Sequence, residues 1–338
     1  MTENPYLSVS IILLSFVLAL VLTGFVKRAL LQRAVLDIPN DRSSHKIPVP
    51  RGGGWALVGL LLPAMIGATF FYDHSLRHVG LIGAVFVLAG ISWLDDRSHV
   101  NPLVRLALHL FAAWLGSLSF SSQELLFGGA LPFWLDRALM ILGWAWFINL
   151  YNFMDGIDGI TGIETLCIAN GVSFAFTVAS IDLPFVDFLT LILTGLSLGF
   201  LAHNWHPAKI FLGDIGSVPL GYLAGFCLLS LAVKGYLVAA LILPLYYIAD
   251  SGITLTRRAL RHEKIWQAHR EHFYQQAALG AGRHDKVVWL ITTANLGLIL
   301  AACIALSHPL EGGLCAILIV ALLLRKMHKT GAQRVQKL

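Results

Sequence analysis

Long apolar segments separated by short polar ones run along the whole 338-residue chain. A helix needs about 20 apolar residues to cross a bilayer, within a range of about 17–25. Eleven charge-free runs approach or reach that length: 8–26, 52–72, 78–94, 106–123, 138–154, 165–181, 188–208, 215–233, 235–249, 287–310 and 312–324. The pattern predicts an all-α, polytopic integral membrane protein with about 10–11 transmembrane helices.

Two of the runs, 235–249 and 312–324, are short for a full crossing, so either is expected to span only with support from its neighbours or to be re-entrant. Lys234 alone separates run 235–249 from run 215–233, which predicts a tight hairpin at that residue. The first run is preceded by residues without Lys or Arg. This favours a retained first span over a cleaved signal peptide.

The composition excludes most other classes of protein. Hydrophobic residues make up 57% of the chain and charged residues 13%, whereas soluble domains carry about a quarter charged residues. A pair of soluble domains, a disordered chain and a nucleic-acid-binding module are therefore excluded, despite the net charge of +5. We expect one transmembrane domain over residues 1–338.

The basic residues sort to one side of the predicted membrane. If the N-terminus lies outside and the spans alternate, 21 of the 24 Lys and Arg residues fall on the inner side. Positive residues of short loops stay cytoplasmic, so this distribution predicts the orientation. The expected cytoplasmic loops are 27–51, 95–105, 150–160, 203–214 and 250–286, and we expect any chemistry to face the cytoplasm.

Five aspartates stand at the inner ends of apolar spans, where a membrane protein usually avoids charge: Asp95, Asp96, Asp155, Asp158 and Asp214. Acids at membrane depth are costly and mark functional sites by default. Asp95 and Asp96 are neighbours on a helix and do not face each other, so we expect them to have different partners. The structural alternative is a solvated helix end with Arg97 as counter-ion.

Asp155 and Asp158 share a glycine-rich segment with Asn152. Their three-residue spacing predicts that both lie on one face of a helical turn, and the glycines let a ligand come close. Two carboxylates near backbone N–H groups suit Mg²⁺, which takes one or two carboxylates plus substrate phosphates. Asp214 opens a span, so it is either a metal ligand or a carboxylate stabilised at a helix N-terminus.

Two long polar loops add cations to this side. His269, Arg270 and His272 suit a diphosphate or a sugar, and we expect the two histidines to share a helix face. The alternative is an amphipathic helix on the anionic inner leaflet, and a zinc site is disfavoured because no HExxH motif is present. Lys46 and Arg51 precede a glycine triplet where a phosphate would meet charge and open N–H groups, or they only anchor the loop inside.

Five motifs, in the expected order, resemble the polyprenyl-phosphate N-acetylhexosamine-1-phosphate transferases, the MraY/WecA-type superfamily of glycosyltransferase family 4. They are SSHKIPVPRGGG at 43–54, the Asp95–Asp96 pair, NFMDGIDG at 152–159, FLGDIGS at 211–217 and HREHFYQ at 269–275. The resemblance implies about ten or eleven spans in a bacterial cytoplasmic membrane and a cytoplasmic active site. It also implies transfer of a sugar-1-phosphate from a UDP-N-acetyl sugar to undecaprenyl phosphate, with release of UMP.

The same resemblance implies roles for individual residues. Asp214 matches the Mg²⁺ ligand, with Mn²⁺ able to replace the ion. Asp155 and Asp158 match the metal and nucleotide carboxylates, and Asp95 matches the residue proposed as a base, with Asp96 beside it. By the same resemblance, Asn152 would position the nucleotide, and Lys46 and Arg51 would bind the lipid phosphate.

One departure bears on the substrate. The peptidoglycan-precursor branch carries adjacent histidines in the last large loop, whereas this chain reads His-Arg-Glu-His. The difference favours the branch that starts O-antigen or other surface polysaccharides on a simple N-acetyl sugar. The UDP-MurNAc-pentapeptide transferase stays the alternative, and the oligomeric state, including a homodimer, stays open.

Three other functions compete with this interpretation. A secondary transporter also uses intramembrane acids, but its site lies near the midplane, and Glu164 is the nearest acid to that position. The CDP-alcohol phosphotransferases carry a different aspartate pattern. A purely structural role leaves the five aspartates unexplained. Within the transferase reaction, the acceptor phosphate is already charged at neutral pH, which favours one-step displacement over an aspartyl-phosphate intermediate.

Overall fold

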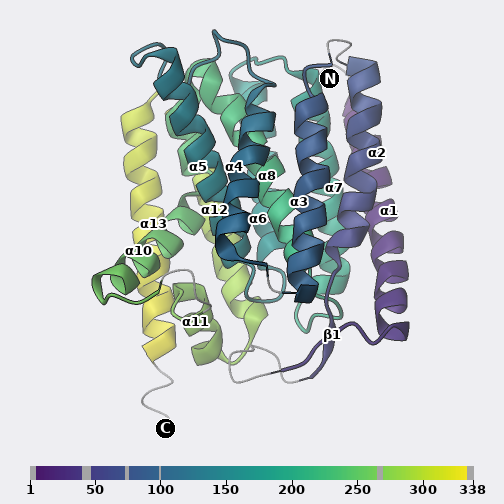
Figure 1. Ribbon diagram of the computed structural model, residues 1–338. Helices are drawn as coiled ribbons and strands as arrows, with labels where there is room; N and C mark the ends of the chain where they lie inside the picture. The colour runs from purple at the N-terminus through teal and green to yellow at the C-terminus, as the bar shows by residue number, and fades with distance from the viewer. Residues whose placement is uncertain (1–4, 40–46, 73–75, 99, 265–268, 333–338) are drawn as a thin grey trace.

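The computed structural model describes residues 5–39, 47–72, 76–98, 100–264 and 269–332. Within these ranges the chain forms helices joined by short loops, and Figure 1 shows most of them standing side by side in one bundle. The helices are α1 Pro5–Gln32, α2 Gly54–Tyr72, α3 Val79–Ser98, α4 Pro102–Ser117, α5 Phe133–Phe153, α6 Ile160–Val178, α7 Pro184–Asn204, α8 Asp214–Leu231, η1 Ala232–Tyr236, α9 Leu237–Ile242, α10 Leu245–Leu260, α11 Phe273–Ala281, α12 His284–Ala305 and α13 Pro309–Ala332.

The all-α, multi-pass prediction is confirmed. Each of the eleven apolar runs overlaps a helix. In the described part of the chain, seven helical segments are long and apolar enough to cross a membrane, with α8 and α9 counted together, and α4 is a shorter apolar helix. The protein is therefore a multi-pass membrane protein, while a total of ten or eleven crossings stays a prediction.

The predicted hairpin at Lys234 is confirmed in its essentials. Gly235 has φ of 93° and interrupts the helical path inside η1, and α9 packs back against α8. Lys234 lies close to Glu124, with 3.0 Å between the ammonium nitrogen and a carboxylate oxygen. Pro244 then separates α9 from α10, which projects away from the bundle in Figure 1.

The long loops contain more regular structure than their polarity suggests. α1 continues to Gln32, so the first polar segment begins inside a helix, and both α10 and α11 lie partly or wholly within segment 250–286. Strands β1 Leu36–Asp37 and β2 Val49–Pro50 pair antiparallel. These features gather at the end of the bundle where the C-terminus lies in Figure 1.

Backbone contacts tie β2 to the segment that precedes α8. The N–H groups of Gly52 and Gly53 donate to the Phe211 carbonyl oxygen at 3.1 and 2.8 Å, and the Phe211 N–H donates to the Pro50 carbonyl at 2.8 Å. A Cβ placed on Gly54 would lie 2.2 Å from the Gly216 nitrogen. The starts of α2 and α8 are therefore in direct backbone contact, which sets two polar segments beside each other.

Candidate active site

Three sequence-predicted residues meet where α3, β2 and α8 come together. A guanidinium nitrogen of Arg51 lies 2.9 Å from a carboxylate oxygen of Asp96 and 2.9 Å from one of Asp214. The carboxylate of Asp96 also accepts from the backbone N–H groups of Asp214 and Ile215, at 3.4 and 3.3 Å. Residues from three distant parts of the sequence thus meet at the guanidinium group of Arg51.

Asn152 joins this group from the end of α5. Its side-chain nitrogen lies 3.4 Å from the second oxygen of Asp214, and its side-chain oxygen accepts from the Ser217 hydroxyl at 2.7 Å. Asp214 is therefore held from two sides, by Arg51 and by Asn152. The sequence prediction that these residues share one site is supported by their contacts, although their roles stay predictions.

Asp155 lies in the loop between α5 and α6 and accepts from the Thr161 hydroxyl at 2.6 Å. Burial raises the pKa of Asp155 to about 6; the Thr161 hydrogen bond opposes the rise, and the charges of Asp214 and Asp96 add to it. The interaction with those charges places Asp155 in the same electrostatic environment. We call Asp96, Asp155 and Asp214 the aspartate cluster.

The carboxylate of Asp95 has different partners from that of Asp96. It accepts from Arg105 at 2.5 Å and from the Val100 N–H at 2.7 Å. The expectation that the adjacent aspartates Asp95 and Asp96 have different partners is confirmed. Asp95 therefore fixes the turn between α3 and α4 and joins it to Arg105.

The expectation that Asp155 and Asp158 share a helical face is wrong. α5 ends at Phe153 and α6 begins at Ile160, so both residues lie in the connecting loop. Gly159 has φ of 79° and caps α6, a conformation that glycine adopts without strain. Asp158 turns away from the aspartate cluster and contacts His206 at 2.7 Å and His284 at 3.2 Å.

The histidine loop also differs from its prediction. His269 and His272 precede α11, so they share no helix face, but their rings stack with centroids 4.8 Å apart. His272 is buried and its ring lies 3.1 Å from Asp250. Burial and the neighbouring His272 lower the pKa of His269 to about 4. Arg270 lies beside them, and Lys46 lies outside the described residues.

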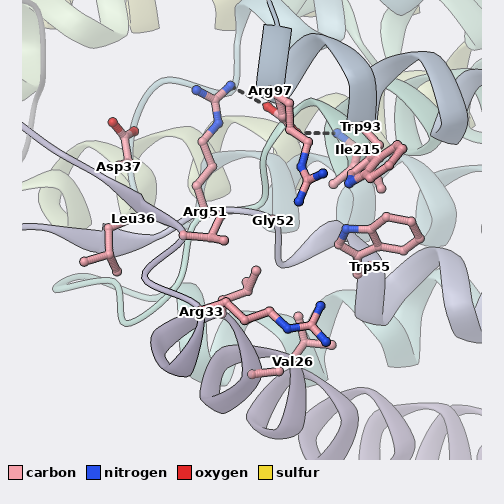
Figure 2. Close-up of a pocket in the computed structure, with 14 residues that line it drawn as sticks. Val26, Arg33, Leu36, Asp37, Arg51, Gly52, Trp55, Trp93, Arg97 and Ile215 are labelled. Atoms are coloured by element: carbon pink, nitrogen blue, oxygen red, sulfur yellow. Dashed lines mark hydrogen bonds and ion pairs between the residues drawn. The ribbon is translucent and has the colours of Figure 1, made fainter.

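A cavity of about 460 Å³ opens beside the aspartate cluster, between α1, the β1–β2 hairpin, α2 and α3. Figure 2 shows Arg33, Arg51 and Arg97 around it, contributed by three different segments. Trp55 and Trp93 form one wall with ring centroids 6.3 Å apart. The remaining lining is largely aliphatic, and it includes Val26, Ala29 and Leu30 from α1.

Sequence reasoning missed several residues that organise this end. Asp250 is fully buried and accepts from the Phe273 and Tyr274 N–H groups at 3.0 and 3.1 Å, which ties α10 to α11. Its position directly after the apolar run 235–249 was the signal that could have identified it. His206 and His284 gave no signal, because each is a single histidine at a helix end.

Comparison with known proteins places the chain in a family. Residues 78–232 match glycosyl transferase family 4. Over 250 residues the chain is 30% identical to a phospho-N-acetylmuramoyl-pentapeptide-transferase of Synechococcus elongatus (strain ATCC 33912 / PCC 7942 / FACHB-805), covering 65% of this chain and 67% of that protein. The chain belongs to glycosyl transferase family 4.

Other similar proteins have names that refer to N-acetylglucosamine. A probable undecaprenyl-phosphate N-acetylglucosaminyl 1-phosphate transferase of Bacillus subtilis (strain 168) is 25% identical over 276 residues, 78% of this chain and 75% of that protein. A decaprenyl-phosphate N-acetylglucosaminephosphotransferase of Mycobacterium tuberculosis (strain ATCC 25618 / H37Rv) is 32% identical over 222 residues, 59% of this chain. The match spans 54% of the mycobacterial protein. The family resemblance drawn from the motifs is confirmed.

Proposed function

We propose that this protein transfers an N-acetylhexosamine-1-phosphate from a UDP-sugar to undecaprenyl phosphate and releases UMP. One observation carries the proposal: Arg51 joins Asp96 and Asp214 of the aspartate cluster at one end of an apolar bundle, beside a cavity with both cationic and apolar walls. The names of the relatives from Bacillus and Mycobacterium describe the same class of reaction. We place the reaction at the cytoplasmic face of a bacterial inner membrane.

The donor atoms of the aspartate cluster fit a hard divalent cation. Mg²⁺ prefers oxygen ligands and is usually held by one or two carboxylates plus substrate phosphates. One guanidinium nitrogen already lies 2.9 Å from both Asp96 and Asp214, so these carboxylates converge on a position suited to positive charge. Asp214 and Asp155 would hold Mg²⁺, or Mn²⁺ in its place, and the ion would neutralise the charge of the diphosphate.

The residues of the site then have separable tasks. Arg51 supplies positive charge where two anionic substrates must meet. Asn152, which is itself fixed by the Ser217 hydroxyl, holds the Asp214 carboxylate in place, and Thr161 holds Asp155. Such fixed positioning is the main contribution that proteins make to phosphoryl transfer.

The acceptor needs little activation. A phosphate monoester carries about −1.5 to −2 charge at pH 7, so it attacks the sugar-linked phosphorus of the donor without a strong base. Asp95 is engaged by Arg105 and Val100, which suits an orienting role. This favours one-step displacement with inversion at phosphorus. Net retention of configuration would support an aspartyl-phosphate intermediate instead.

The cavity of Figure 2 is suited to the acceptor. Arg33 and Arg97 provide charge for its phosphate, and the aliphatic side chains of α1 provide a surface for its isoprenoid chain. The two tryptophans belong to a residue type that is enriched at membrane–water interfaces. The acceptor phosphate would thus approach the aspartate cluster from the membrane side.

A panel of donors tests the proposed function and its finer assignment. Purified protein in detergent is mixed with undecaprenyl phosphate, Mg²⁺ and one UDP-sugar at a time, and UMP is measured. We expect release with a simple UDP-N-acetylhexosamine, as at the start of an O-antigen or other surface polysaccharide, and loss of release with EDTA. Release only with UDP-MurNAc-pentapeptide would assign the peptidoglycan reaction, which the Synechococcus relative's name makes the second candidate. No UMP with any donor would contradict a transferase.

A further inference from the structure

A second group of metal-type side chains lies apart from the aspartate cluster. Asp158 comes from the α5–α6 loop, His206 from the segment after α7, and His284 from the first residue of α12. A ring nitrogen of His206 lies 2.7 Å from one Asp158 oxygen, and a ring nitrogen of His284 lies 3.2 Å from the same oxygen. One ligand atom from each residue lies within 4.8 Å of the others.

The donor set is chemically different from that of the aspartate cluster. Two imidazole nitrogens and one carboxylate oxygen are typical ligands of zinc, at distances of about 2.0–2.2 Å. Ligands at those distances in a tetrahedral site are separated by roughly 3.3 Å, close to the 3.2 Å between Asp158 and His284. Mg²⁺ prefers oxygen ligands, so the two groups would select different ions.

The surroundings hold the three side chains in place and leave one side open. The Ala208 N–H donates to the same Asp158 oxygen at 3.2 Å, and Asn204 accepts from the Gly159 N–H at 2.9 Å. Fixed outer contacts of this kind orient metal ligands. Asp158 and His284 are buried, whereas the His206 side chain is 26% exposed, which gives an ion and a water ligand access from the surface.

The local charge also favours a cation. The three side chains together carry one negative charge when the histidines are neutral. Asp285 lies near enough to His206 for their charges to interact. The nearby Arg283 is already engaged by Asp285 through two hydrogen bonds, so its charge is compensated locally.

We propose that Asp158, His206 and His284 form a binding site for a zinc-type divalent cation. The ion would join the α5–α6 loop to the end of α7 and the start of α12, three segments that the sequence separates widely. Since the same loop carries Asp155, the bound ion would also fix the position of Asp155 in the aspartate cluster. The proposal does not depend on the proposed transferase activity.

Metal content tests the proposal directly. The protein is purified through a streptavidin-binding tag, because a polyhistidine tag would bind the same ions. It is then incubated with zinc, dialysed and analysed by mass spectrometry of its metals. We expect about one zinc ion per chain in the unmodified protein, and tetrahedral visible absorption bands when Co²⁺ replaces zinc. His308→Gln, which changes an exposed histidine elsewhere, should retain the ion.

A conservative variant separates metal binding from simple hydrogen bonding. In His206→Asn the side-chain amide can still donate to Asp158, but it is a poor zinc ligand. We expect this folded variant to lose at least about tenfold in zinc affinity and to lose the rise in melting temperature that zinc gives the unmodified protein. Equal zinc binding by the variant and the unmodified protein would overturn the proposal. Absence of zinc from both proteins would also overturn the proposal. The three residues would then only join their segments by hydrogen bonds.

Discussion

Arg51 balances the charge at the centre of the site. Two carboxylates this close to each other would repel strongly without a cation between them, and one guanidinium nitrogen contacts both at 2.9 Å. The side chain is still 41% exposed, so an incoming phosphate can reach it. In the proposed reaction, Arg51 would contact the substrate phosphate as well as the two carboxylates.

Asp214 is the residue whose charge the proposed reaction needs most. Asp214→Asn keeps the side-chain shape but removes the negative charge that a metal ion requires. We expect the rate of UMP release to fall by more than about 100-fold. Mutation of a residue that only hydrogen-bonds to a metal ligand already costs about 10–100-fold in metal affinity or activity. The rate of UMP release under saturating Mg²⁺ measures this.

Asp182→Asn serves as the matched control, because Asp182 is exposed in the loop between α6 and α7. It should leave the rate unchanged. If Asp214→Asn were equally active, with the same melting temperature as the unmodified protein, Asp214 would not be a metal ligand.

The arginines that line the cavity should affect the KM for undecaprenyl phosphate and not the KM for the UDP-sugar. In Arg97→Gln the cavity loses one positive charge beside Trp93, over which the guanidinium stacks at 4.8 Å. Loss of an exposed charge contact costs about 1 kcal/mol, which is roughly fivefold in the KM for undecaprenyl phosphate. The KM for the UDP-sugar should stay unchanged, as initial rates at varied concentrations of each substrate will show.

Arg28→Gln is the comparison for this measurement, since Arg28 lies on α1 outside the cavity lining. A similar rise in acceptor KM for Arg28→Gln would mean that general surface charge, and not the cavity, attracts the acceptor. An unchanged KM for Arg97→Gln would exclude the cavity as the acceptor site.

At the scale of elements, the contact between α2 and α8 sets the distance between Arg51 and Asp214. A Cβ at Gly54 would meet the Gly216 backbone at 2.2 Å, where nothing flexible can give way. We expect Gly54→Ala to separate the two helix starts, to lower stability by about 1–3 kcal/mol and to reduce UMP release. Thermal unfolding and activity assays together measure both effects.

Gly67→Ala provides the control on the same helix, because a Cβ there meets nothing within 4 Å. It should fold and react normally. Normal activity of Gly54→Ala would show that the spacing of α2 and α8 does not limit the site.

A buried polar pair joins α6 and α12. The Asn295 side chain donates to Glu164 at 2.7 Å, and both residues are almost completely buried. The pair lies inside apolar spans, where a transporter would use an acid to carry charge. In a transferase the same pair only connects two helices.

Glu164→Gln should therefore retain the full rate of UMP release, because glutamine can still accept from Asn295. Asn295→Leu leaves Glu164 without its partner, and we expect it to lower stability by about 1–3 kcal/mol. Unfolding and activity measurements on both variants check this. Loss of all activity in a folded Glu164→Gln protein would argue that the acid moves a proton during function.

On the scale of the whole molecule, the polar chemistry collects at one end of the bundle. The β1–β2 hairpin and α11 lie toward the end that carries the C-terminus in Figure 1, and Arg51, which follows β2, contacts Asp96 and Asp214 of the aspartate cluster. The opposite end carries Glu124, bridged to Lys234 and Arg77 at 3.0 and 3.5 Å. The uneven distribution of Lys and Arg predicts that the aspartate end is cytoplasmic.

Cysteine labelling of intact cells tests this orientation. In a background without the exposed Cys315, a membrane-impermeant maleimide should label Ser122→Cys at the opposite end. It should label Arg261→Cys, beyond α10, only after the membrane is permeabilised. The reversed pattern would place the aspartate cluster outside and contradict the proposed use of a cytoplasmic UDP-sugar.

The sequence by itself determined the class of fold and pointed to Arg51, Asp96, Asn152, Asp155 and Asp214 as candidates for one site. Apolar length and charge position are local properties, so the eleven runs predicted where helices form, and the five aspartates could be read at span ends. The expectation that Asp95 and Asp96 have separate partners also followed from local geometry, since adjacent helical positions diverge.

Only the tertiary structure decided which side chains meet. Asp158 contacts His206 and His284, 48 and 126 residues away in the chain, and Arg51 contacts Asp214 across 163 residues. Such pairings depend on helix packing and on loop paths, such as the loop between Phe153 and Ile160 in which Asp155 and Asp158 take different partners. The hydrophobic pattern does not specify those paths, because helices that face lipid and helices that face the protein interior carry similar apolar side chains.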